Sequence, residues 1–470
     1  PEDWDALRKQ GHLMLDDMFD YLQHIRSRPV WQTIPDEVRA QFQQPLPHHP
    51  SDIVTAHQTF MQSILPYAVG NSHPGFMGWV HGGGTPVGML AEMLAAGLNA
   101  NLGGRNQIPV EVERQVLRWV CELFGFPEDA SGLFVTGTSM ATLIALLVAR
   151  HAALGPQVRT LGIAASGKRL TAYASTSAHG CVAKMMDMTG IGTDALRMIP
   201  VNTQYEMDIV ALERAIENDR ANGYIPFFIA ATAGSVNTGA IDALTRIADV
   251  AKQNKLWFHI DGAYGALAML APDIAPRLKG LERADSIAFD FHKWGQVPYD
   301  AGFVLIRDRQ QHFDTFASPA AYLRRETHGL AGGSPWPCDF GVDLSRSFRA
   351  LKTWFTLQVY GADKIGRIIS HTCELARYLA QRIEQTLELE LLAPVSLNIV
   401  CFRYRCQDAN RINAEIVIAL QEAGIVAPST TILHEHLAIR VAIVNHRTNK
   451  GDIDALIRAT LEIGTARMTS

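Results

Sequence analysis

One lysine of this chain stands in a setting that would change its chemistry. Lys293 follows a predicted strand and lies among aromatic residues, in the run FDFHKWG at 289–295. An amine in apolar surroundings loses basicity and becomes a nucleophile that can form a Schiff base. Lysines such as Lys252 and Lys255 instead have the polar neighbours of a solvated helix face. Taken alone, this setting favours a lysine whose stem lies on apolar surface while its amine reaches water, and only the further motifs change that interpretation.

A carboxylate ends another predicted strand, in the run WFHIDGAYG at 257–265. Open α/β sheets bind their ligands at the carboxyl ends of strands, where Asp261 is expected. Asp261 could cap a helix or pair with the ring nitrogen of a cofactor, since a pyridinium kept protonated by a buried carboxylate is a strong electron sink. Ala263 follows at a position from which its methyl group could lie against a flat ring.

A third motif, FVTGTSMA at 134–141, leads from a strand through glycine and hydroxyl residues into a helix. Amides and hydroxyls at a helix N-terminus form an anion site, although a plain Ser or Thr cap would also explain the run. The run lacks the spacing of a P-loop, and neither it nor GGG at 82–84 is a GxGxxG fingerprint. A lysine, an acid and a phosphate-binding turn together indicate pyridoxal 5'-phosphate (PLP) bound at strand ends.

Alternating strand and helix patterns would position these residues. Such alternation from about residue 130 predicts a mostly parallel sheet with covering helices. The last two expected strands are separated by a short gap, so part of the sheet should be antiparallel. The expected strands are 133–136, 172–175, 226–231, 256–260, 286–290 and 302–306, and the expected helices are 139–151, 179–188 and 241–254.

The two ends of the chain have different patterns. Apolar residues at helical spacing predict a helix at 5–28, followed by a proline-rich connector at 29–50 that could cross a subunit interface or pack on its own chain. Beyond residue 361 the pattern predicts a smaller α+β domain, with a helix at 363–387, a strand at 397–404, a helix at 411–423, a strand at 438–444 and a final helix. The chain thus divides into an N-terminal helical arm (1–80), a large cofactor-binding domain (81–360) and a small C-terminal domain (361–470).

Composition excludes several classes of partner. The chain has 470 residues, 47% of them hydrophobic, and 42 Lys and Arg against 47 Asp and Glu, so it has no basic field for a nucleic acid or an anionic membrane. Six scattered cysteines without a CxxC pair argue against a disulfide framework and a zinc site. No apolar run approaches the ~18 residues of a membrane span. A cytoplasmic, metal-free enzyme is expected, although the start at Pro1 leaves a removed leader open.

The ordered motifs resemble those of the group II PLP-dependent decarboxylases, the family of the aromatic amino acid, histidine and glutamate decarboxylases. The resemblance runs over nearly the whole length. It implies the PLP-dependent transferase fold type I, with a large, mostly parallel sheet of the seven-stranded type, a small C-terminal α+β domain and an N-terminal helical arm. The matching motifs are RPV at 28–30, HPGF at 73–76, MLAEML at 89–94, ATL at 141–143, HID at 259–261, HKW at 292–294 and SFRALK at 347–352.

The resemblance also implies roles for individual residues. Lys293 would form the internal aldimine with PLP, and Asp261 would pair with the pyridine nitrogen. His179 would stack on one face of the ring and Ala263 would cover the other, while His292 would contact the phosphate or the substrate carboxylate. Thr138 and Ser139 would bind the phosphate, and Ser235 would lie near the phenolic oxygen of the cofactor.

The implied reaction converts an aromatic or related L-amino acid to its amine and CO2. The implied assembly is a homodimer in which residues 1–80 help to complete active sites at the subunit interface. An alternative from another class is a catalytically silent cofactor-binding scaffold, but the retention of Lys293 and Asp261 argues against it.

One departure from the family concerns the residue that returns a proton to Cα. The aromatic amino acid enzymes have a tyrosine on a loop where this chain has GGSPWPC at 332–338, so that Trp336 or Pro337 occupies its place. Tyr322 and His328 are fallback donors in the same loop, 318–343. If protonation is slow, the intermediate could react with oxygen and give an aldehyde, which is the enzymatic alternative.

A second departure concerns the substrate pocket. The family's aromatic-contacting positions become Trp79, Val80, His81, Asn101 and Gly103, so polar or minimal side chains replace part of an apolar wall. Arg105 could contact an acidic substrate tail, or it could be a surface or interface arginine. The sequence therefore leaves the amino acid substrate open.

Overall fold

The computed structural model describes residues 3–318 and 325–468, which form two compact units. One unit comprises residues 87–373 and 394–397, and the other comprises residues 1–86, 374–393 and 398–470. The predicted division into an arm, a large domain and a small domain stays a prediction, while in the structure the first 86 residues group with the C-terminal residues. The physical reason is a strand pairing, since β1 (Phe76–Met77) lies parallel to β11 (Ala427–Leu433) in one sheet.

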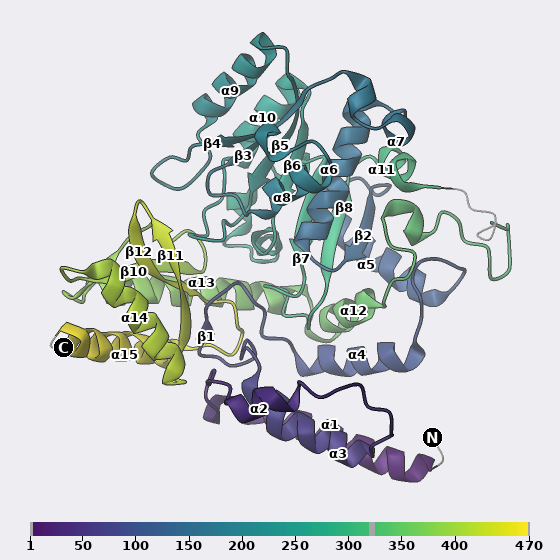
Figure 1. Cartoon of the computed structure of the whole chain (residues 1–470). Helices are drawn as coiled ribbons and strands as arrows, with labels where there is room; N and C mark the ends of the chain where they lie inside the picture. Colours follow the sequence, from purple (N-terminus) through teal and green to yellow (C-terminus); the bar gives the residue numbers. More distant parts are fainter. Residues whose placement is uncertain (1–2, 319–324, 469–470) are drawn as a thin grey trace. The chain divides into compact units, whose positions relative to one another are not determined.

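The larger unit contains a seven-stranded sheet in the order β2-β8-β7-β6-β5-β3-β4 (Figure 1). β8 is antiparallel to both of its neighbours and the other adjacent pairs are parallel, which confirms the predicted mixed sheet. The short edge strand β4 has a half-exposed pattern that the sequence analysis did not pick out. The bounds are β2 (Ser131–Val135), β3 (Leu170–Ser175), β4 (Leu196–Ile199), β5 (Ile225–Thr232), β6 (Trp257–Asp261), β7 (Ser286–Asp290) and β8 (Gly302–Ile306).

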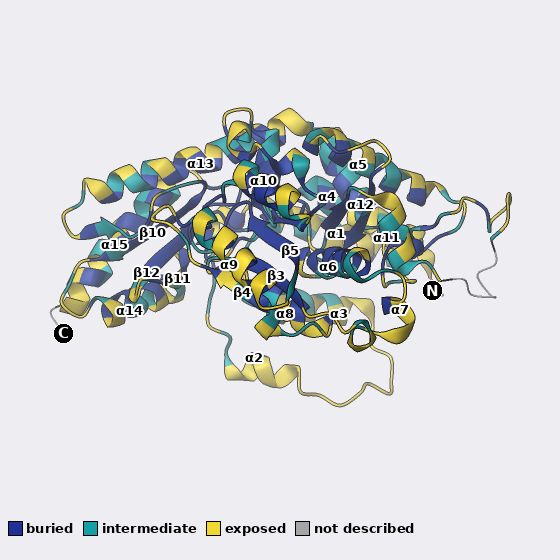
Figure 2. Cartoon of the chain, turned by 90° about the horizontal axis from the view of Figure 1, so that it is seen from above, coloured by how far each residue is buried: buried dark blue, intermediate teal, exposed yellow. Residues whose placement is uncertain are grey.

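Successive side chains along each strand point to opposite faces of this sheet, and helices cover both faces. Leu133 and Val135 of β2 pack on one face against α6 (Thr138–Leu154). On the other face, Phe289 of β7 meets Phe124 of α5 (Ile108–Phe124) edge to face, with ring centroids 5.1 Å apart. Because both faces are covered, inner strands such as β3 and β5 are buried, and they are dark blue in Figure 2.

The other helices of the larger unit lie around this sheet, and several begin later than the sequence predicts. α8 starts at Cys181 because His179 and Gly180 form a turn, and α10 starts at Leu244. The bounds are α4 (Pro86–Leu98), α7 (Val158–Leu161), α8 (Cys181–Met188), α9 (Ile209–Ala221), α10 (Leu244–Asn254), α11 (Arg309–Phe316), α12 (Arg349–Tyr360) and α13 (Ala362–Glu384), whose last residues, from 374 on, belong to the other unit.

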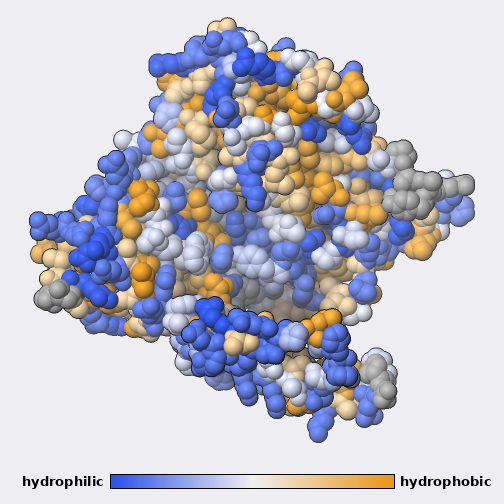
Figure 3. Space-filling view, viewed as in Figure 1, coloured by the Kyte–Doolittle hydropathy of each residue, from blue (hydrophilic) through white to orange (hydrophobic). Residues whose placement is uncertain are grey.

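The smaller unit contains a five-stranded sheet in the order β1-β11-β12-β10-β9, antiparallel except for the β1 pairing. Its N-terminal helices carry a mainly hydrophilic surface in Figure 3. No helix among the described residues is long and apolar enough to cross a membrane. The remaining bounds are β9 (Leu389–Leu391), β10 (Ile399–Tyr404), β12 (His436–Ala442), α1 (Trp4–Gln23), α2 (Asp36–Gln41), α3 (Ile53–Thr59), α14 (Ala409–Glu422) and α15 (Lys450–Met468).

Candidate active site

Lys293 lies in the turn that follows β7, at the edge of the sheet where β6 and β7 end. Its Nζ atom is 3.0 Å from Oδ2 of Asp290, the last residue of β7. The turn is held in place by Trp294, which is fully buried and donates a hydrogen bond from Nε1 to Oγ1 of Thr372 at 3.0 Å. A buried aromatic anchor and a buried carboxylate therefore fix the position of the lysine amine.

Asp261 is the last residue of β6 and is 3% exposed. Its Oδ1 atom accepts a hydrogen bond from the backbone N–H of Ala263 at 3.1 Å, and the Cys181 thiol lies 3.9 Å from Oδ2. Burial raises the pKa of Asp261, and the nearby positive charge of Lys293 opposes that rise. A cationic partner stabilises the ionised form of a carboxylate in this setting.

The third motif forms the turn between β2 and α6. The Thr138 hydroxyl is buried and has no hydrogen-bond partner within residues 3–318 and 325–468, while Ser139 is exposed. A side chain added at Gly137 would lie 3.8 Å from both Oδ1 of Asp290 and Cε1 of His292. The turn therefore faces the end of β7, and Gly137 leaves space between them. We call residues 136–139 the hydroxyl turn.

His292 is buried beside the hydroxyl turn. Its Nδ1 atom accepts a hydrogen bond from the backbone N–H of Ala301 at 2.9 Å, and its Nε2 atom is 3.7 Å from Oδ2 of Asp290. Burial lowers the pKa of His292 to about 4, so the ring is neutral near pH 7. Since Nδ1 accepts, the single ring hydrogen sits on Nε2, which can donate to a bound anion.

The other predicted cofactor residues surround the same strand ends. His179 is exposed in the turn before α8, where its Nδ1 accepts from the backbone N–H of Cys181 at 3.2 Å. A positive charge on His179 would lower the pKa of Asp261, which marks the two as electrostatic neighbours. Ser235 is buried in the loop after β5, and its hydroxyl contacts the Thr238 hydroxyl at 3.0 Å.

The predicted substrate residues fall into two sets, one in each unit. In the smaller unit, Trp79 is 52% exposed, and the centroid of its ring lies 6.0 Å from the centroid of the His81 ring. In the larger unit, Oδ1 of Asn101 accepts hydrogen bonds from the backbone N–H groups of Gly103 and Arg346, both at 2.9 Å. Asn101 and Gly103 are thus engaged in holding the segment around residue 346.

Side chains from the C-terminal residues hold the segment that carries Trp79 and His81. Arg447 donates to the carbonyl oxygens of Gly83 at 3.0 Å and Gly84 at 3.2 Å. The neighbouring Asn445 amide donates to the carbonyl oxygen of Asn71 at 3.0 Å. Arginine and asparagine side chains therefore help to position this segment, which directly follows β1.

Trp336, one of the two candidates for the place of the family's loop tyrosine, has a ring that is 1% exposed. The guanidinium groups of Arg105 and Arg325 lie 4.5 Å and 3.6 Å from the ring centroid. A side chain at Gly104 would come within 2.5 Å of this ring. Arg105 is therefore engaged with the loop. His328 lies in the same loop and contacts Thr327, whereas Tyr322 lies outside the described residues.

Asp290 is a further residue of this site that was not predicted from the sequence, although a signal for it was present. Asp290 ends a buried apolar strand three residues before Lys293, just as Asp261 ends the neighbouring strand. An acid at the carboxyl end of such a strand is placed where ligands bind. Cys181 was also missed, because only the folded chain brings its thiol next to Asp261.

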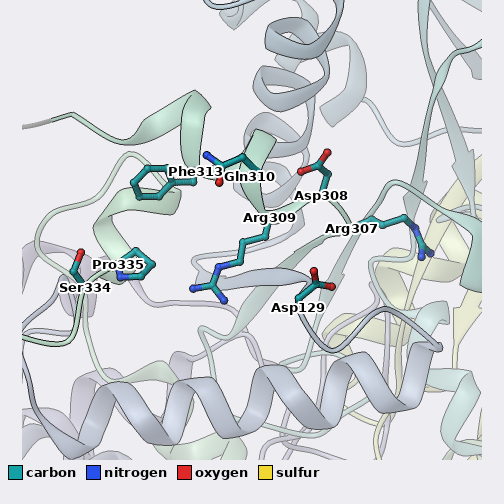
Figure 4. Close-up of a pocket in the computed structure, with 8 residues that line it drawn as sticks. All are labelled: Asp129, Arg307, Asp308, Arg309, Gln310, Phe313, Ser334 and Pro335. Atoms are coloured by element: carbon teal, nitrogen blue, oxygen red, sulfur yellow. The ribbon is translucent and has the colours of Figure 1, made fainter.

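A pocket of about 570 Å³ opens elsewhere in the larger unit (Figure 4). Asp129 precedes β2 and Arg307 follows β8, so the pocket lies at the edge of the sheet opposite to the hydroxyl turn. It contains none of the predicted site residues. Its lining residues are Asp129, Arg307, Asp308, Arg309, Gln310, Phe313, Ser334 and Pro335.

The residues at the strand ends fit PLP. The buried Thr138 hydroxyl, which has no partner among the described residues, and the space left by Gly137 suit a phosphate group. The buried Asp261 suits a protonated ring nitrogen. Lys293 supplies the amine that such a cofactor needs. No group of three or more metal-binding side chains occurs within the part of the chain that the structure describes.

Comparison with known proteins identifies the class. The family model of the pyridoxal-dependent decarboxylase conserved domain matches residues 35–405. The chain belongs to this family. It is therefore a PLP-dependent amino acid decarboxylase, and the family, cofactor and class of enzyme predicted from the sequence are confirmed.

Individual relatives and structures are similar over nearly the whole chain. An aromatic-L-amino-acid decarboxylase from Bacillus atrophaeus is 32% identical, over 94% of this chain and 92% of the relative. A phenylacetaldehyde synthase from Arabidopsis thaliana is 28% identical, again over 94% of this chain and 92% of the relative. The Oryza sativa TDC solved with PLP and tryptamine has a TM-score of 0.91 at 24% identity, covering 100% of this chain and 99% of that one. This structural similarity confirms the predicted fold type I.

Proposed function

We propose that this enzyme converts an aromatic or related L-amino acid to its amine and CO2, with Lys293 as the covalent anchor of PLP. The observation that carries the proposal is the placement of Lys293 and Asp261 at the ends of adjacent parallel strands beside the hydroxyl turn. The 32% identity to an aromatic-L-amino-acid decarboxylase supports an aromatic or related substrate.

Bound PLP supplies an electron sink for the pair of electrons left when the carboxylate departs as CO2. In this proposal, the buried carboxylate of Asp261 keeps the ring nitrogen protonated. The Nε2–H of His292 and the hydroxyls of Thr138 and Ser139 bind the phosphate. His179 covers one face of the ring and Ala263 the other, while Ser235 lies near the phenolic oxygen.

Orientation of the substrate decides which bond at Cα breaks, since PLP enzymes with other pockets transaminate or racemise. We assign this orientation to Trp79, His81, Asn101, Gly103 and Arg105. Asn101 and Gly103 would act mainly through the backbone of the neighbouring loop, because their polar groups are engaged there.

Formation of an aldehyde is the second candidate, because one specific observation favours it. The loop position of the family's tyrosine falls on Trp336 or Pro337, neither of which is a phenol, and Trp336 is a buried ring whose Nε1 donates to the carbonyl oxygen of Gly332 at 2.8 Å. An indole held in this way is a poor proton donor to a substrate carbon. One relative is named for an aldehyde product, the phenylacetaldehyde synthase.

We also propose that the enzyme is a cytoplasmic homodimer whose active sites are shared between subunits. Exposed apolar residues on two helices support the dimer, since monomers rarely expose such patches. On α4, Met93, Leu94 and Leu98 are each about half exposed, and on α1, Trp4 is 65% exposed. Loss of activity on dilution to the monomer would support the shared site, and a fully active monomer would contradict it.

The decisive experiment is a product screen with the PLP-loaded enzyme. CO2, amine, aldehyde, peroxide and ammonia are measured for each proteinogenic amino acid and for aromatic and acidic analogues. The amine with CO2 alone supports decarboxylation, whereas aldehyde with equal peroxide and ammonia supports the second candidate. Lys293→Ala should abolish turnover, and Lys252→Ala on an outer helix is the matched control. Unchanged turnover in Lys293→Ala would refute the assignment of the anchor.

A further inference from the structure

Asp290 links the lysine to the hydroxyl turn. Its side chain is 2% exposed, and its Oδ2 atom is 3.0 Å from Nζ of Lys293. The other oxygen, Oδ1, is buried, has no hydrogen-bond partner among the residues that the structure describes, and is 3.8 Å from the side-chain position of Gly137. A buried carboxylate oxygen therefore faces the turn that suits a phosphate.

This arrangement creates a charge conflict. A phosphate at the hydroxyl turn would bring negative charge next to the carboxylate of Asp290, and like charges in a buried site repel strongly. The ammonium of Lys293 neutralises Asp290 only while the lysine keeps its extra proton. A lysine must lose that proton before it can attack a carbonyl carbon.

Neighbouring groups are poorly placed to take the proton. The Nδ1 atom of His292 is occupied by the backbone N–H of Ala301, and its Nε2 atom already carries the ring hydrogen. Asp261 must remain ionised if it is to hold a protonated ring nitrogen. Asp290 is the carboxylate in contact with the amine.

We propose that Asp290 is the base that prepares Lys293 for the cofactor, an inference that rests on the proposed role of Lys293 as anchor. One proton passes from the Lys293 ammonium to the Asp290 carboxylate, leaving a neutral amine and a neutral carboxyl group. The amine then bonds to the aldehyde carbon of PLP and the aldehyde oxygen leaves as water. The same transfer removes the negative charge of Asp290 as the phosphate arrives. One proton transfer therefore both frees the Lys293 amine and removes the repulsion between Asp290 and the phosphate.

The test compares Asp290→Asn with the native apoenzyme in two measurements. The first is the rate of covalent loading by PLP, followed by stopped-flow absorbance, which should fall about 10²-fold because the base is lost. The second is the equilibrium affinity for pyridoxine 5'-phosphate, which has the phosphate but no aldehyde. This affinity should rise about tenfold, because the repelling charge is gone while the lysine remains.

These opposite changes separate the proposal from a structural role. A variant that is merely misfolded would bind pyridoxine 5'-phosphate less tightly, and this result would overturn the proposal, as would loading at the native rate. Asp290→Ala removes the same charge and should give the same pair of changes if the Asn variant does not fold. The matched control is Asp285→Asn. Asp285 lies just before β7, and its carboxylate accepts a hydrogen bond from the backbone N–H of Phe258. This variant should leave both measurements unchanged.

Borohydride trapping distinguishes failure of this inference from failure of the anchor assignment. Reduction of the loaded native enzyme followed by peptide mapping should label Lys293. A label on another lysine would refute the anchor and with it the role of Asp290. A label on Lys293 together with unchanged loading in Asp290→Asn would refute the role of Asp290 alone.

Discussion

The Nδ1 atom of His292 accepts a hydrogen bond from the backbone N–H of Ala301 at 2.9 Å. This contact, together with a pKa lowered to about 4 by burial, keeps the ring neutral with its hydrogen on Nε2. His292 is therefore a hydrogen-bond donor through Nε2 and not a base, and its Cε1 atom would lie 3.8 Å from a side chain at Gly137 in the hydroxyl turn.

The lowered pKa of His292 predicts a specific pH dependence of stability. Because the folded-state pKa of about 4 lies below the unfolded value of about 6.5, His292 stabilises the fold above pH 6.5, and this contribution is lost as the pH falls toward 4. Between pH 6.5 and pH 4, the free energy of unfolding of the native apoenzyme should fall by up to about 3 kcal/mol more than that of His292→Asn. Urea unfolding at stepped pH measures the difference, with the exposed His328→Asn as control. Parallel curves for native protein and His292→Asn would contradict the prediction.

Cys181 should tune Asp261 through its thiol, which lies 3.9 Å from the carboxylate. Cys181→Ser supplies a stronger donor and should lower the pKa of Asp261, so turnover is retained. Cys181→Val removes the donor and should reduce kcat by about threefold to tenfold, the cost of a weak hydrogen bond. The change should appear in kcat and in the absorbance maximum of bound PLP, with KM nearly constant. Buried Cys373→Val is the control, and equal effects in both valine variants would indicate a packing defect only.

Trp336 should be a major stabiliser of its loop, because the buried ring contacts two guanidinium groups. Trp336→Ala should lower the free energy of unfolding of the larger unit by about 3–5 kcal/mol. Gly104→Ala should also destabilise it, since the added methyl group would come within 2.5 Å of the ring. Leu330→Ala, at an exposed position of the same loop, should change stability by less than about 0.5 kcal/mol. Denaturant unfolding tests the three variants, and a stable Trp336→Ala would disprove the anchoring role.

Arg447 should act on the substrate and not on the cofactor. Arg447→Ala removes the donors to the carbonyl oxygens of Gly83 and Gly84, so the segment with Trp79 and His81 loses its position. We expect KM to rise about tenfold while PLP affinity stays constant, because Trp79 and His81 are proposed to contact the substrate and not the cofactor. Exposed Arg458→Ala is the matched control. If PLP affinity falls together with KM, Arg447 has a general structural role instead.

The motifs around the cofactor could be recognised from the sequence because each is local. Asp261 ends an apolar strand, and Lys293 and Thr138 each follow an apolar strand within three residues. Strand ends are visible as an apolar run followed by polar or glycine residues. The mixed sheet was also predictable, since a short connection between β7 and β8 requires antiparallel strands. The short strands β1 and β4 were missed because their pairing partners, rather than their own residues, make them strands.

The sequence by itself determined the family, the cofactor and the residue types at the strand ends, because hydrophobic periodicity and contiguous motifs are properties of neighbouring residues. Only the tertiary structure decided which side chains meet across long separations. Folding places the Cys181 thiol beside Asp261, stacks Arg105 on Trp336 and leaves Oδ1 of Asp290 facing Gly137. Such contacts depend on strand order and helix packing, which no short stretch of sequence encodes.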